Sequence, residues 1–153
     1  MSHDSKQYLL DAYLGELGGE SSFLAMIAHL PEHEEKLRLL ATVEKETAAA
    51  LAPYLEEKPS ASTVADVHNA ATERMKTFQL DSWSAMIDGV LPIVDDALAQ
   101  IIEAEQHAPE ALRDIYRTYT AHEQALADCL RLEKEGKDGS GALTQYLATL
   151  ATD

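Results

Sequence analysis

The sequence predicts an all-α fold: an antiparallel helical bundle with an extra short helix at the C-terminus. Long segments repeat apolar residues at the 3.6-residue spacing of an amphipathic helix. No segment alternates apolar and polar residues with the period of a strand, and no turn dipeptide is flanked by strand-like runs. The 153 residues suit one domain with a single well-buried core, so one helical-bundle domain is expected over residues 1–153.

The first helix is expected from about Ser5 to His29, with Asp4 or Ser5 as its N-cap. Two adjacent glycines, Gly18 and Gly19, interrupt its middle and cost about 1 kcal/mol each relative to alanine. They indicate either close approach of another helix or local freedom beside a site. The expected core stripe is Leu10, Tyr13, Leu17, Leu24 and Ile27, with Glu20 in step.

Pro31 marks a turn and is well placed to begin a second helix, which is expected to continue to about Glu57. Pro53 should bend or loosen its last turns. The segment 58–62 is the clearest loop in the chain. The expected core stripe of the second helix is Leu37, Leu40, Ala41, Ala48, Leu51 and Leu55, with Glu44 among them.

A third helix is expected over 63–78 and a fourth from Trp83 to about 107. Residues 80–82 either cap the fourth helix or kink one continuous helix over 63–107. The next helix runs from about 109 to 135, where Gly136 stops it. A last short helix is expected over 142–150, covering a side or an end of the bundle.

Composition narrows the function classes. With 12 Lys and Arg against 27 Asp and Glu, the formal charge of −15 repels phosphate backbones, so nucleic-acid binding is not expected. No apolar run is long enough for a membrane span, and the polar start of the chain lacks a signal-peptide core. The one cysteine, Cys129, excludes an internal disulfide and indicates a reducing, cytoplasmic setting, with an inert buried thiol.

The acids within the apolar stripes are the best functional lead, because a buried carboxylate is costly unless something pairs with it. Glu20 lies 11 residues before Pro31 and Glu44 lies 13 after it. These separations are about 16 and 20 Å along antiparallel helices, so the two acids are expected near one level. In the second hairpin, Asp95 lies 13 residues before the turn at 108 and Glu123 lies 15 residues after it. These two acids are therefore expected near one level as well.

Four helices that each carry an inward carboxylate at mid-height are the arrangement of carboxylate-bridged di-metal bundles. Over about residues 5–135 the chain thus resembles the ferritin-like superfamily, through this hairpin and the segment 119–126, Tyr-Thr-Ala-His-Glu-Gln-Ala-Leu. The resemblance implies a divalent metal, iron or manganese. The implied metal ligands are Glu20, Glu44, Asp95, His122 and Glu123, with His68 as another nitrogen donor.

The sequence departs from this superfamily at the histidines of its Glu-x-x-His motifs. Thr47 follows Glu44 at that spacing, and Leu126 follows Glu123. Two hypotheses therefore stand: a metal-free interaction or small-ligand-binding module, which the missing motifs favour, or a carboxylate-rich metal-binding oxidoreductase or metal handler. A homodimer formed through a helix face is also expected, and a haem-oxygenase-like or other all-α enzyme has no specific motif here.

Overall fold

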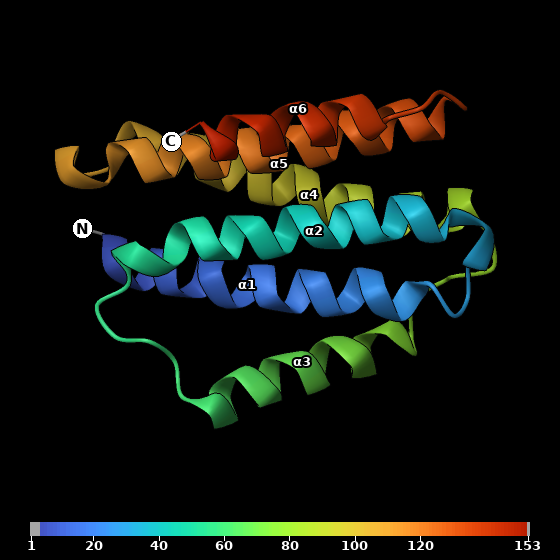
Figure 1. Ribbon diagram of the computed structural model, residues 1–153, viewed down its shortest axis with the longest axis horizontal. Helices are drawn as coiled ribbons and strands as arrows, with labels where there is room; N and C mark the ends of the chain where they lie inside the picture. Colours follow the sequence, from blue (N-terminus) through green and yellow to red (C-terminus); the bar gives the residue numbers. More distant parts are fainter. Residues whose placement is uncertain (1–3, 153) are drawn as a thin grey trace.

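A computed structural model describes residues 4–152 of the chain. These residues form six α-helices and no strand, which confirms the all-α prediction (Figure 1). None of these helices is both long enough and apolar enough to cross a lipid bilayer. The helices are α1 (Ser5–Met26), α2 (Glu34–Leu51), α3 (Ala61–Met75), α4 (Trp83–Gln106), α5 (Arg113–Lys134) and α6 (Ser140–Ala151).

Several helix ends differ from the predicted ones because proline shortens the regular helix. The chain passes through single 3₁₀ turns at Pro31–His33 and Ala52–Tyr54, so α2 ends at Leu51 rather than near 57. Proline lacks the amide hydrogen that would continue the helix. The N-cap of α1 is Asp4, whose carboxylate accepts hydrogen bonds from two first-turn amides, as predicted.

Residues 63–107 form two helices rather than one kinked helix. The Ser82 hydroxyl accepts a hydrogen bond from the Ala85 amide at 3.0 Å and so caps α4. Within the connection, the ring of Phe78 lies where a side chain on Gly89 would go, 3.1 Å from its ideal Cβ position. The glycine in α4 therefore lets the connection pack closely against that helix.

The helices pack as two hairpins with two additional helices on the outside (Figure 1). Helix α1 pairs with α2, and α4 pairs with α5. Helix α3 lies along the outer side of α1, and α6 covers α5 and α2. The arrangement leaves α3 with a small apolar contact, since Ala71 and Met75 are its buried residues.

The core divides into two apolar clusters with a polar layer between them. In α1, Leu9 belongs to one cluster and Met26 to the other; in α5, Tyr116 and Leu130 divide in the same way. Between these positions α1, α2 and α5 each bury a charged or titratable side chain. The polar residues of this layer are Glu16, Glu44, Thr47, His122 and Glu123.

A buried carboxylate outside the polar layer, Glu133, has an evident structural role. Glu133, near the end of α5, accepts hydrogen bonds from the Gly139 amide at 2.7 Å, Lys36 Nζ at 2.5 Å and Trp83 Nε1 at 3.1 Å. Burial alone would raise the pKa of Glu133, but these hydrogen bonds and the Lys36 charge lower it overall. One ionised carboxylate thus joins α5 to α2, α4 and the start of α6.

Candidate metal site

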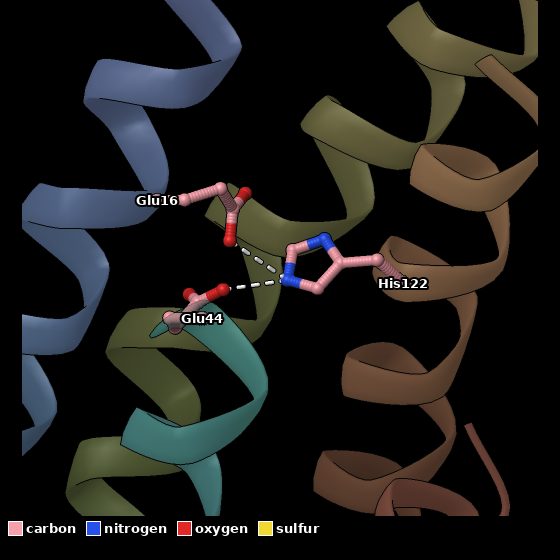
Figure 2. A group of neighbouring side chains, drawn as sticks. All are labelled: Glu16, Glu44 and His122. Carbon is pink, nitrogen blue, oxygen red and sulfur yellow. Dashed lines mark hydrogen bonds and ion pairs between the residues drawn. The ribbon is translucent and has the colours of Figure 1, made fainter. Parts of the chain in front are cut away.

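Three helices bring one titratable side chain each to a single point in the polar layer. Figure 2 shows Glu16 of α1, Glu44 of α2 and His122 of α5 pointing toward one another. The residues are 3%, 6% and 0% exposed, respectively. His122 Nε2 lies 2.5 Å from Oε2 of Glu44 and 3.0 Å from Oε2 of Glu16. Two carboxylates from different helices therefore converge on one ring nitrogen.

The glycine pair of α1 makes this convergence possible. A Cβ atom on Gly19 would lie 2.9 Å from Cδ and 3.2 Å from Cγ of Glu44, and closer still to Oε1. The Glu44 carboxylate therefore occupies the space left by the missing side chain. Gly18 faces α3 instead, where its Cβ would lie 3.5 Å from Val67 Cγ1. Close approach of another helix thus describes Gly18, whereas Gly19 lies beside the site and makes room for a carboxylate within a regular helix.

The protein groups do not satisfy every polar atom of the site. Nε2 of His122 carries at most one hydrogen and bonds to Glu44, which leaves Oε2 of Glu16 buried without a hydrogen bond. On the other side of the ring, Nδ1 also lacks a hydrogen bond of good geometry, although Oε1 of Glu123 lies 3.4 Å away. Buried polar atoms without partners are uncommon in folded proteins and call for a ligand, ion or water.

The pKa values of the three groups shift in different directions. Burial raises the pKa of Glu16 well above its ordinary value, and the neighbouring charge of Glu44 raises it further. Burial opposes ionisation of Glu44 too, but His122 and a hydrogen bond with Glu16 lower its pKa overall. Burial would likewise lower the pKa of His122, yet Glu16 and Glu44 raise it well above 6.5. Without an ion, the favoured state is neutral Glu16, ionised Glu44 and charged His122.

The same three groups have the donor set and spacing for one divalent cation. Their ligand atoms, two carboxylate oxygens and one imidazole nitrogen, lie within 4.8 Å of one another. An ion about 2.1 Å from each ligand atom needs those atoms about 3.0–3.4 Å apart. His122 Nε2 and Glu44 Oε2 must therefore separate by less than about 1 Å. The ion replaces two protons, from Glu16 and His122, so the net charge of the buried group is unchanged.

A pocket of about 350 Å³ opens beside the site. Glu16, Glu44 and Glu123 contribute to its wall together with Tyr119, whose ring stacks on His122 with centroids 5.4 Å apart. Most of the remaining wall is apolar. The volume lies at the lower end of the range of about 300–1,000 Å³ typical of ligand pockets. A small molecule can therefore reach the carboxylates that surround His122.

The structure brings together three of the predicted site residues and leaves two apart. Glu44, His122 and Glu123 lie in the polar layer. Glu20 is only half-buried and lies outside the group formed with His122. Asp95, with its side chain 40% exposed, forms a surface ion pair with Arg131. The additional candidate nitrogen donor, His68, contacts the hydroxyl of Ser21 through Nδ1 rather than the site.

Sequence reasoning missed Glu16 because it chose the wrong face of α1. The predicted stripe, which contains Leu17 and Leu24, lies one residue away from the buried positions, and Leu24 is 40% exposed. Apolar residues occur on all sides of this helix, so periodicity alone does not select a face. The glycine pair was the available signal, since Gly19 lies three residues after Glu16 on the same face. The buried positions of α1 are Leu9, Ala12, Glu16, Gly18, Phe23 and Met26.

Comparisons with protein-family models, with curated proteins and with solved structures found no match to this chain.

Proposed function

We propose that this protein binds one divalent transition-metal ion through Glu16, Glu44 and His122 and offers it to a small molecule in the adjoining pocket. One observation carries the proposal: two buried carboxylates from different helices point at the same imidazole nitrogen, and the Glu16 oxygen nearest to it, Oε2, has no hydrogen bond. A third helix supplies the histidine, so the fold itself assembles the donor set.

The energetics favour a cation at this position. Two carboxylates that share one site cannot both ionise without strong repulsion, and their burial adds a desolvation cost. His122 can donate only one hydrogen bond through Nε2, which leaves Oε2 of Glu16 without a hydrogen bond. A divalent ion interacts with both carboxylates at once and converts the least satisfied oxygen of the site into a ligand.

The donor set indicates which ions fit. Imidazole together with carboxylates suits manganese, iron or zinc, whereas calcium and magnesium prefer all-oxygen sites. Glu123 lies where an outer carboxylate could accept a hydrogen bond from Nδ1 of His122, an arrangement that commonly orients a histidine ligand. Three protein ligands also leave coordination positions open, as in catalytic rather than structural metal sites.

The metal-free alternative has an observation of its own. Nε2 of His122 lies 2.5 Å from the Glu44 carboxylate, close enough for a charge-assisted hydrogen bond. In that state neutral Glu16, ionised Glu44 and charged His122 form a balanced buried network. The protein would then be a small-ligand-binding module whose pocket is lined by acidic groups, with no ion involved.

Metal content separates the two functions. The protein is purified without chelators, loaded in turn with manganese, ferrous iron or zinc, desalted and assayed for metal per chain by inductively coupled plasma mass spectrometry. Glu44→Gln keeps the size of the side chain and removes a ligand charge, while Glu20→Gln makes the same change outside the site. We expect about one ion per chain in the wild type and in Glu20→Gln, and a loss in Glu44→Gln. Equal retention in all three proteins, or no retention, contradicts the proposal.

A further inference from the structure

We infer that the pocket beside Glu16, Glu44 and His122 binds a small amphipathic monocarboxylate, whose anionic group pairs with Arg74 and whose apolar body lies along the pocket wall. The inference adds a ligand class to the proposed metal site and rests on it only for the role of the ligand beside the ion. The contact with Arg74 needs no metal.

The wall of the pocket selects an apolar body. Helices α1, α4 and α5, with the end of α3 and the connection after it, contribute the apolar side chains. Phe78 is held in place against Gly89 and closes part of this surface. The ligand therefore gains most of its affinity from buried apolar area, at about 25 cal/mol per Å². The apolar wall residues are Phe23, Met26, Met75, Val90, Val94 and Leu126, with Ile93, Ala97 and Phe78.

Arg74 is the one basic side chain among the described residues that line the pocket. It is exposed and forms no ion pair with any residue from 4 to 152, in a chain with 27 acidic and only 12 basic residues. Two residues further along the chain, Lys76 pairs with Glu73 at 2.8 Å. The guanidinium of Arg74 instead lies against the glycine face of α1, 3.7 Å from the ideal Cβ position of Gly18.

The acidic residues of the pocket lie against His122 rather than against Arg74. Glu44 and Glu16 lie 2.5 and 3.0 Å from Nε2 of that ring, and Glu123 lies 3.4 Å from Nδ1. Arg74 is therefore a charged group of the pocket wall that has no ion pair among the described residues. A planar guanidinium binds a carboxylate through two parallel hydrogen bonds, which makes a carboxylate its best-matched partner.

Three eight-carbon probes test this ligand class: octanoate, octylamine and octan-1-ol, which share a chain and differ in the charge of the head group. Each is titrated calorimetrically into the wild type, Arg74→Gln and Lys76→Gln, with the metal content of every sample measured. Both substitutions remove one exposed positive charge from the same segment of the chain, so they have the same effect on net charge. Only Arg74 lines the pocket.

We expect octanoate to bind more tightly than octylamine or octanol, and Arg74→Gln to weaken octanoate about tenfold. Lys76→Gln should leave the affinity within about twofold, and octanol should not distinguish the three proteins. Tighter binding of octylamine, no binding of octanoate, or an equal effect of both substitutions overturns the inference. Octanoate binding that depends on Arg74 in a protein without metal would sustain this inference while the metal content contradicted the proposed function.

Discussion

Replacing Gly19 by alanine tests the packing of the site with a single methyl group. Its Cβ would lie 2.9 Å from Cδ of Glu44, so the carboxylate must leave its position beside His122. Gly15 provides a matched control one turn earlier on α1, because a Cβ there meets nothing within 4 Å. Both substitutions exchange glycine for alanine inside the same helix, and they differ in what the new methyl group contacts.

The expected magnitudes follow from two opposing effects. Alanine is favoured over glycine in a helix by about 1 kcal/mol, so Gly15→Ala should raise the free energy of unfolding by about that amount. Gly19→Ala has the same gain, but it displaces Glu44 from His122. Breaking a buried pair costs about 3–5 kcal/mol, and the adjoining pocket lets the displaced carboxylate reach water and recover part of this. We expect Gly19→Ala to be about 2 kcal/mol less stable than Gly15→Ala.

Urea unfolding followed by circular dichroism measures the difference. With a slope of about 2 kcal/mol per molar urea, the midpoints of the two variants should differ by about 1 M. Metal affinity, measured on the same samples, should fall in Gly19→Ala and stay unchanged in Gly15→Ala. Equal midpoints together with equal metal affinities would show that the position of the Glu44 carboxylate does not depend on the space beside Gly19.

Three further predictions concern protonation, the α5–α6 connection and the thiol. The raised pKa of His122 gives the metal-free protein stability that is fully present below 6.5 and is lost as pH rises through the folded-state pKa. The raised pKa of Glu16 has the same consequence, because stability is lost when this buried carboxyl group ionises at high pH. Glu16→Gln should therefore be more stable than the wild type at pH 8 by about 1 kcal/mol, and it should bind no metal. A lower free energy of unfolding than the wild type, measured in urea, contradicts this. Gly139→Ala should lower the free energy of unfolding by about 2 kcal/mol, since its Cβ would lie 2.8 Å from Cα of Cys129. In the control Gly141→Ala the new Cβ meets nothing within 4 Å, so this variant should be as stable as the wild type or more stable. Equal urea midpoints of the two variants argue against the clash at Gly139. Burial raises the pKa of Cys129 to about 12, so a thiol reagent at pH 8 should modify it only in urea; rapid modification of the native protein contradicts its burial.

The sequence was most informative where a residue has one structural meaning. Pro31 and Ser82 lie at helix boundaries in the structure. Gly136 follows the end of α5 as predicted, and it is the one described residue with a positive φ, 78°. Such residues affect only the backbone beside them, so the sequence alone indicates where they begin or end a helix. The helices could therefore be located without any knowledge of tertiary contacts, although residues 63–107 were compatible with one kinked helix as well as with the two that form.

The site could be predicted only in part because it depends on which face of each helix turns inward. In α2 and α5 the apolar stripe is one-sided, and Glu44, His122 and Glu123 are buried as expected. In α1 apolar residues surround the helix, so the choice between Glu16 and Glu20 was made by packing against α2 and α3. The heights of the acids along the two hairpins allowed several sets of acids to meet in the core. The rotation of each helix about its own axis decides which of these acids point inward.

Anomalous diffraction from crystals grown with manganese or zinc shows directly whether Glu16, Glu44 and His122 hold a metal ion. Data collected above and below the absorption edge of the metal locate the ion independently of any assay of activity. We expect one strong anomalous peak per chain, about 2.1 Å from Glu16 Oε2, Glu44 Oε2 and His122 Nε2. A fully loaded crystal without a peak among these three atoms, or with its peak at Glu20 or Asp95, would contradict this expectation.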